Sequence, residues 1–290
     1  MSIEITTAFV QQYTDNVIML SQQKGSVLRD TVQLDSQVQG KYRFFERIGA
    51  TSAVKKTARH GDTPLVNTPH SRRRATLWPY EWADLVDEPD QHRMLINPES
   101  KYAMNAAWAM GRAMDDEIIA AIYGTSYAGE DGSTSITFPV SQQVAQGTAS
   151  LTVAKLRAAK VLLERADVDP DEPRYICAPP SAIDNLLSDS TVTSSDYNTI
   201  KALVQGDINT FVGFEFKKSN RLPLVTTGTY RAAYAWAKGG LGLGIAQDVK
   251  TRISERPDKS YSVQVFLSMD IGATRVEEEK VVEIPCLATD

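Results

Sequence analysis

The sequence predicts an α+β fold organised around one long helix. Three observations predict it. A helical pattern runs without interruption over residues 98–123, two strand-like runs flank a turn-rich centre between residues 42 and 85, and short strands and helices alternate over residues 174–250. The chain has 290 residues, of which 42% are hydrophobic, so it is long enough to bury a large core.

The first 40 residues are expected to form an arm. Phe9, Tyr13, Val17 and Leu20 recur at spacings of three and four, which predicts an amphipathic helix over residues 1–23. Seven glutamines within residues 1–40 indicate that the remainder is polar and extended, with few residues to build its own core. The start lacks the basic and apolar blocks of a secretory signal, and no apolar run is long enough to span a bilayer. We therefore expect a soluble protein made inside the cell.

A long hairpin is predicted next. Strand-like runs over residues 42–58 and 71–85 flank a centre that contains Gly61-Asp62-Thr63-Pro64 and Asn67-Thr68-Pro69. An isolated two-stranded hairpin is marginally stable in water. We therefore expect this hairpin to lie against another surface.

Two helices with recognisable start signals follow the hairpin. Asn97 is placed as N-cap and Pro98 as the first helical residue of a helix that ends at Tyr123, before Gly124. At 1.5 Å per residue this helix would be about 40 Å long. Thr152 is placed as the N-cap of a second helix, which extends to about Ala166.

The remaining elements are shorter. Strands are predicted over residues 135–140, 174–178, 210–217, 230–236, 251–253, 261–269 and 273–284, and helices over residues 180–187 and 197–204.

Charge is segregated along the chain, although the net charge is only −5. Residues 41–85 contain nine basic and four acidic side chains, a net charge of +5, whereas residues 86–131 contain three basic and nine acidic ones, a net charge of −6. The molecule as a whole is too acidic for a dedicated nucleic-acid reader.

No pattern supports catalytic or cofactor chemistry. Cys177 and Cys286 belong to no CxxC or CxxH cluster and are expected to be reduced and partly buried, and His60, His70 and His92 lack metal-site spacing. Residues 239–244, Gly-Gly-Leu-Gly-Leu-Gly, lack the lysine of a phosphate loop, which favours a flexible loop or a close-packed strand over a nucleotide site. We therefore expect no enzyme, no cofactor and no metal.

Three charged runs are the candidate interaction residues. Arg72, Arg73 and Arg74 could clasp phosphate, but the acidic residues nearby favour an exposed hairpin face that pairs with acidic surface. Residues 115–117, Asp-Asp-Glu, point about 100° apart on a helix, which favours a solvated or intersubunit face over acid–base catalysis. Residues 277–279, Glu-Glu-Glu, are interpreted as charged protection of a strand edge.

The order of these parts resembles the major capsid proteins of tailed double-stranded DNA bacteriophages, the Hong Kong 97 type fold. The likeness covers essentially the whole chain, and short stretches look like members from short-tailed and related marine-type phages. These stretches are residues 59–64, 71–74, 115–121, 196–206, 211–214 and 272–279.

The resemblance implies a division into five parts. They are an N-arm (1–40), an extended loop (41–90), a peripheral domain with the spine helix and the second helix (91–173), an axial domain (174–250) and return strands of the peripheral domain (251–290).

The resemblance also implies what the protein binds. Copies would associate as pentamers and hexamers into an icosahedral head around double-stranded DNA, bound without sequence specificity. A separate scaffolding protein, a portal and a decoration protein are implied partners, no membrane is involved, and the protein would assemble in the bacterial cytoplasm and reside in the virion. The extended loop would overlap a neighbouring copy, and its +5 charge suits the −6 of the helix region. The contact candidates are Arg59, Arg72, Arg73, Arg74, Asp115, Asp116 and Glu117.

Two alternatives stay open. One is an encapsulin-like nanocompartment shell protein, which shares the fold. The other is a soluble α+β enzyme of unrecognised type, which would form a small oligomer with a ligand pocket.

Overall fold

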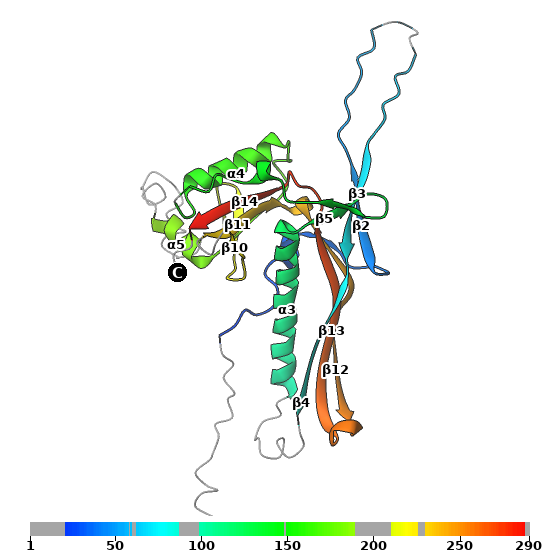
Figure 1. Cartoon of the computed structure of the whole chain (residues 1–290), viewed down its shortest axis with the longest axis vertical. Helices are drawn as coiled ribbons and strands as arrows, with labels where there is room; N and C mark the ends of the chain where they lie inside the picture. The colour runs from blue at the N-terminus through cyan, green and yellow to red at the C-terminus, as the bar shows by residue number, and fades with distance from the viewer. Residues whose placement is uncertain are drawn as a thin grey trace, which may run out of the picture. The chain divides into compact units, whose positions relative to one another are not determined.

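The computed structural model describes residues 21–57, 59, 62–86, 99–147, 149–188, 210–225 and 230–287 (Figure 1). The chain forms two compact units. The first comprises residues 1–26, 79–113 and 247–270, and the second comprises residues 27–78, 114–246 and 271–290.

Three α-helices and four short 3-10 helices are present in the described residues. The α-helices are α3 (Glu99–Tyr123), α4 (Val153–Arg165) and α5 (Pro180–Ser188), and the 3-10 helices are η1 (Arg29–Thr31), η2 (Val140–Gln142), η3 (Lys238–Gly240) and η4 (Pro257–Lys259). The predicted long helix is confirmed by α3, and the Thr152 cap is confirmed because its side chain accepts a hydrogen bond from Lys155 N at the start of α4. Asn97, Pro98 and the helices predicted over 1–23 and 197–204 lie wholly or mostly outside the described residues.

A six-stranded sheet lies in the second unit. Its strands run in the order β10-β11-β7-β9-β8, with β14 paired to β11. Their bounds are β7 (Arg174–Ala178), β8 (Thr210–Phe211), β9 (Phe214–Lys218), β10 (Leu224–Val225), β11 (Tyr230–Ala237) and β14 (Val281–Leu287). The single strand predicted over 210–217 is wrong, because positive φ angles at Val212 and Gly213 turn the chain back between β8 and β9.

The core of the second unit lies between this sheet and α4, which runs over β14 in Figure 1. Leu156, Ala159 and Leu163 recur at spacings of three and four on α4 and are fully buried. They belong to the same cluster as Ile176 and Ile284 of the sheet. Burial of each leucine or isoleucine side chain contributes about 1.5–3 kcal/mol to folding.

Two four-stranded sheets complete the fold. One has the order β2-β3-β5-β6, and the other has the order β1-β12-β13-β4. The bounds are β1 (Gln33–Asp35), β2 (Tyr42–Ile48), β3 (His70–Thr76), β4 (Trp78–Val86), β5 (Ser126–Ala128), β6 (Thr134–Ile136), β12 (Leu241–Arg256) and β13 (Ser262–Arg275).

The hairpin differs from the prediction in two ways. The strand predicted over 42–58 ends at Ile48, and the strand predicted over 71–85 is divided between two sheets at Leu77. Leu77 is buried, and its backbone N–H donates to the carbonyl oxygen of Lys41 at 2.9 Å, in register with the last β2–β3 pair, Tyr42 and Thr76. The strand of the other sheet, β4, begins one residue later at Trp78. The single long hairpin is therefore a short one, β2–β3, followed by a change of sheet.

Part of the predicted arm packs against its own chain. Leu28 and Val32 are fully buried, and Trp236 Nε1 donates to the carbonyl oxygen of Thr31 at 3.0 Å. Within the first unit, a Cβ on Gly111 would lie 2.4 Å from the backbone of Gly25, so the arm crosses α3 in close contact. Leu28, Thr31, Val32 and Val38 are thus buried by contacts within the chain itself.

The glycine-rich run 239–244 forms η3 and the first residues of β12. A Cβ on Gly242 would lie 2.6 Å from the ring of Phe45, so this glycine is required by close packing. The close-packed strand considered for this run is confirmed.

Candidate interaction surface at the base of the hairpin

The three consecutive arginines of β3 do not form one cluster. Because side chains alternate across a strand, Arg73 points to one face and Arg72 and Arg74 to the other. Arg73 shares its face with buried Phe45 and Ala75, whereas Arg72 and Arg74 are partly exposed. The hairpin base, which we define as residues 41–48 and 70–76, therefore has a buried face and an outer face.

The buried face is organised around Glu278. Arg73 donates to its carboxylate from Nη2 at 3.0 and 2.9 Å and from Nε at 3.3 Å, and Arg47 Nη1 lies 3.4 Å from it. Arg275 Nε lies 4.0 Å away. We call Arg47, Arg73, Arg275 and Glu278 the guanidinium cluster. One carboxylate holds three cations here, so removing it would leave buried positive charge without compensation.

Arg275 connects this cluster to the end of α3. Its side chain is fully buried, and its Nη1 donates to the carbonyl oxygens of Ile122 and Gly124 at 2.7 and 2.9 Å. A cation at a helix C-terminus satisfies unpaired carbonyls and complements the helix dipole. Burial lowers the pKa of Arg275, and the Glu278 carboxylate opposes that shift.

Sequence reasoning missed Glu278. The run 277–279 was predicted to protect a strand edge, which is wrong because these residues lie in the turn between β13 and β14. Arg47 and Arg275 were also missed. Arg47 and Glu278 are 231 residues apart, so no local signal joins them, whereas Arg275 lies only three residues before Glu278.

The outer face carries Arg72 and Arg74, each against aromatic rings. Arg72 pairs with Glu46 at 3.3 Å and lies over Phe44. The guanidinium carbon of Arg74 lies 4.7 Å from the ring centroid of Tyr42 and 5.0 Å from that of Tyr127, and its Nη1 donates to the carbonyl oxygen of Asp131. Both arginines remain available on a surface.

The acidic run 115–117 likewise contains one buried side chain and two partly exposed ones. Asp115 is 1% exposed and accepts hydrogen bonds from the backbone N–H groups of Val27 and Leu28 at 3.0–3.2 Å. It is therefore not on the solvated or intersubunit face predicted for it. Asp116 pairs with Arg221, which raises the pKa of that arginine, and Glu117 lines a cavity beside Arg74.

Arg59 lies in the connection between β2 and β3, away from the other candidates. It is exposed, as are most of the described residues of this connection (49–57, 59 and 62–69), which contain neither helix nor strand. Figure 1 shows the connection continuing as two extended chains beyond the ends of β2 and β3.

Chemical sites are not evident in the described part of the chain. There, no group of three or more His, Cys, Asp or Glu side chains could hold a metal ion, and no helix is long and apolar enough to cross a membrane. Cys177 and Cys286 are free and buried, and burial raises the pKa of the Cys286 thiol to about 11. A thiol with a raised pKa is a poor nucleophile at neutral pH.

Comparison with known proteins gives matches over nearly the whole chain. The model of a family described as phage capsid protein matches residues 5–288, whereas no curated protein matches the sequence. Among solved structures, the capsid of cyanophage P-SCSP1u is 17% identical, with a TM-score of 0.76 over 99% of this chain and 95% of that chain.

Two further capsids show the same similarity at lower identity. The capsid of Ralstonia phage GP4 is 10% identical, with a TM-score of 0.73 over 97% of this chain and 95% of that chain. The acid-stable capsid of Helicobacter pylori bacteriophage KHP30 is 10% identical, with a TM-score of 0.74 over 98% of this chain and 97% of that chain. These matches confirm the α+β fold of Hong Kong 97 type.

Proposed function

Because this chain belongs to the phage capsid protein family, we propose that it is the major capsid protein of a tailed bacteriophage. Its copies associate as pentamers and hexamers into an icosahedral shell that encloses double-stranded DNA, and the protein resides in the virion after assembly in the bacterial cytoplasm. Interface energy between copies, not catalysis, carries this function.

The observation that carries the proposal is the exposed connection of the hairpin. Leu65 is 96% exposed, Val54 60%, and Ile48 at the end of β2 is 70% exposed. Exposed apolar residues are ordinary when scattered, but here they gather on a hairpin connection without helix or strand of its own. A neighbouring copy that covered this segment would remove that apolar surface from water.

Charge supports the same contact. Arg59, Arg72 and Arg74 lie on the surface of the hairpin, and Asp116 and Glu117 are partly exposed on α3. We propose that the hairpin of one copy contacts acidic surface of the next. Each exposed ion pair contributes only about 0–1 kcal/mol, but the contact repeats with every copy and so selects one register. Arg73 and Asp115 act within their own chain and support this surface from beneath.

The division into N-arm (1–40), extended loop (41–90), peripheral domain (91–173 and 251–290) and axial domain (174–250) is part of the proposal. We also propose the following partners. A separate scaffolding protein guides assembly, a portal occupies one vertex, a decoration protein can bind the outside, and DNA is held without sequence specificity.

Deletion of residues 59–69 tests the proposal. The shortened chain should fold, as judged by circular dichroism, but should sediment as free subunits under conditions in which the full chain forms large particles. Val140→Ser is the matched control, since Val140 is 79% exposed but lies outside the hairpin. Large particles formed equally well by the deletion variant would contradict an intersubunit role for the hairpin.

A further inference from the structure

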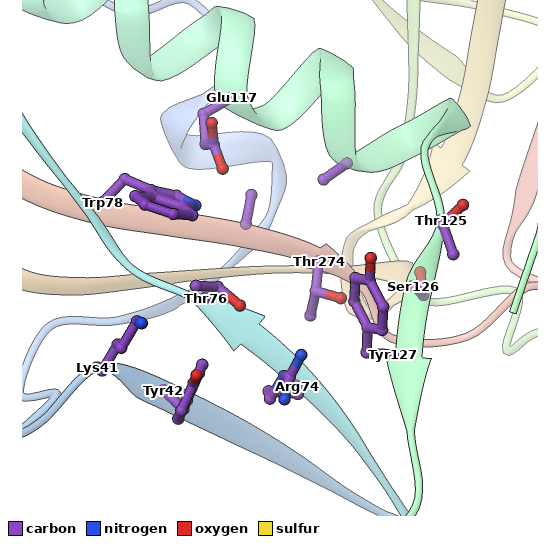
Figure 2. Close-up of a pocket in the computed structure, with 12 residues that line it drawn as sticks. Lys41, Tyr42, Arg74, Thr76, Trp78, Glu117, Thr125, Ser126, Tyr127 and Thr274 are labelled. Carbon is purple, nitrogen blue, oxygen red and sulfur yellow. The ribbon is translucent and has the colours of Figure 1, made fainter. Parts of the chain in front are cut away.

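A polar cavity of about 420 Å³ opens beside the hairpin base in the second unit (Figure 2). Most of its walls come from the first residues of β2 and β4, from β3 and β5, and from α3. The charged and aromatic side chains that line it are Lys41, Tyr42, Arg74, Trp78, Glu117 and Tyr127.

Each of the other four arginines of the hairpin base pairs with a carboxylate, whereas neither cation of this cavity does so among the described residues. Four arginines there lie within 4.0 Å of a carboxylate oxygen, and the pairs are Arg43–Asp35, Arg47–Glu278, Arg72–Glu46 and Arg73–Glu278. Arg74 and Lys41 have no such partner among the described residues. Both face the same cavity, whose lining contains one carboxylate, that of Glu117, so the lining carries a net charge of +1.

Arg74 is held in a fixed position. Its guanidinium lies between the rings of Tyr42 and Tyr127, and its Nη1 is bonded to the Asp131 carbonyl. Gly132 packs against its chain, where a Cβ would come within 2.6 Å of Cδ. A cation fixed in this way loses little further conformational entropy when it binds an anion.

The rim of the cavity has the composition of a binding hot spot. Trp78 is 55% exposed, Tyr42 41% and Tyr127 39%, and all three line the cavity together with Arg74 and Lys41, with Tyr42 and Tyr127 on either side of Arg74 (Figure 2). Tryptophan, tyrosine and arginine are the residues that dominate binding energy in protein interfaces. Large exposed aromatic side chains beside the fixed guanidinium of Arg74 therefore indicate a surface for a protein partner.

We propose that this cavity receives a carboxylate side chain from a second copy of the chain, with Arg74 and Lys41 as the recognising cations. The inference rests on the proposed function, because it assigns one specific contact within the shell. The second copy suits the cavity by charge. Since the total is −5 and residues 41–85 carry +5, the rest of each copy carries −10.

A nucleic-acid phosphate fits this cavity less well. Glu117 places a carboxylate on the cavity wall, and the negative net charge of the chain disfavours approach of a polyanion. With Glu117 on the wall, the two cations leave a net charge of +1 in the lining, which a single incoming carboxylate matches, whereas a DNA backbone brings a row of phosphates.

Substitution of Arg74 is the first test. In DNA-free assembly reactions, Arg74→Gln should weaken subunit association roughly fivefold, while Arg74→Lys should restore most of it. Arg256→Gln is the control, because Arg256 is also a partly exposed arginine but is paired with Asp258 in its own chain. It should assemble like the wild type. Circular dichroism checks that each variant is folded.

Zero-length carbodiimide crosslinking tests the identity of the partner. The reagent joins the amine of Lys41 to a carboxylate in direct contact. Particles assembled from an equal mixture of ¹⁴N and ¹⁵N subunits should yield Lys41 crosslinks in which the two peptides carry different labels. Arg74→Lys should add a second crosslink to the same peptide.

Three results would overturn the inference. They are normal assembly of Arg74→Gln, Lys41 crosslinks that are only within one copy or absent, and a defect of Arg74→Gln that occurs only in DNA-filled particles, which would indicate phosphate binding. In each case the wild type still forms shells. Failure of the wild type to form shells at all would instead contradict the proposed function.

Discussion

Arg73 of β3 donates three hydrogen bonds to the carboxylate of Glu278, a residue 205 positions later in the chain. This pair joins the hairpin base to the turn between β13 and β14. Arg47 and Arg275 approach the same carboxylate, so the hairpin is anchored by one acidic side chain.

Glu278→Gln should therefore destabilise the free subunit by about 2–4 kcal/mol, because three guanidiniums would lose their only shared counter-charge. Urea unfolding followed by circular dichroism measures the loss. Glu279→Gln is the matched control, since Glu279 is the exposed neighbour in the same turn, and it should change stability by less than about 0.5 kcal/mol. Equal effects of the two substitutions would show that Glu278 does not anchor the hairpin.

Asp115→Ala should cost about 1–3 kcal/mol, because the backbone N–H groups of Val27 and Leu28 would lose their acceptor in a buried place. Asp116→Ala removes a partly exposed pair with Arg221 and should cost about 0–1 kcal/mol. Limited proteolysis should also cut the Asp115→Ala variant faster near residue 27. Identical proteolysis of the two variants would contradict a role of Asp115 in holding the arm.

Gly272→Ala should destabilise the fold by about 1–3 kcal/mol, because its Cβ would lie 2.1 Å from the carbonyl oxygen of Thr76, a backbone atom that cannot move aside. Gly244→Ala is the control. Its Cβ would meet Arg43 and Val38 at 3.4 Å, an ordinary contact that flexible side chains can accommodate. Thermal unfolding of both variants tests the difference, and an equal melting temperature would count against the close approach of β13 to the end of β3.

The burial of Glu283 leads us to expect that the stability of the folded chain depends on pH. It is buried in β14, and burial raises its pKa above the ordinary 4.5, while the hydrogen bond from Gln143 opposes the shift. The folded protein therefore holds the Glu283 proton more tightly than the unfolded chain. Its contribution to stability is complete below the unfolded-state pKa and is lost as pH rises through the folded-state pKa.

Glu283→Gln should abolish that loss, because glutamine stays neutral and can still accept the bond from Gln143. Urea unfolding between about pH 4 and pH 8 should show a steeper decline for the wild type than for Glu283→Gln. Parallel profiles would mean that Glu283 titrates alike in the folded and unfolded states.

Local sequence signals predicted α3 and α4 correctly, but they did not predict strand boundaries at which residues far apart in the sequence are in contact. α3 and α4 follow from periodicity and, for α4, from the Thr152 cap, which are properties of neighbouring residues. Where residues 71–85 change sheet, the contacts join residues far apart in the sequence: Leu77 N–H donates to the carbonyl oxygen of Lys41, 36 positions earlier, and Gly272 lies against the backbone of Thr76. Contacts of this kind leave no mark on the local pattern.

The candidate surface was predictable only in part. Side chains alternate along any strand, so the sequence alone could have separated Arg73 from Arg72 and Arg74. The run 277–279 was misinterpreted because three glutamates fit an exposed edge as well as a turn. Only the fold shows that Glu278 has three arginine neighbours and that Arg74 has no carboxylate partner among the described residues.

Negative-stain electron microscopy of the purified chain, made alone and together with the proposed scaffolding protein, tests whether many copies assemble into a closed shell. We expect closed icosahedral particles, with pentamers and hexamers as building blocks. Monodisperse monomers or dimers under every condition, without rings, sheets or shells, would contradict it.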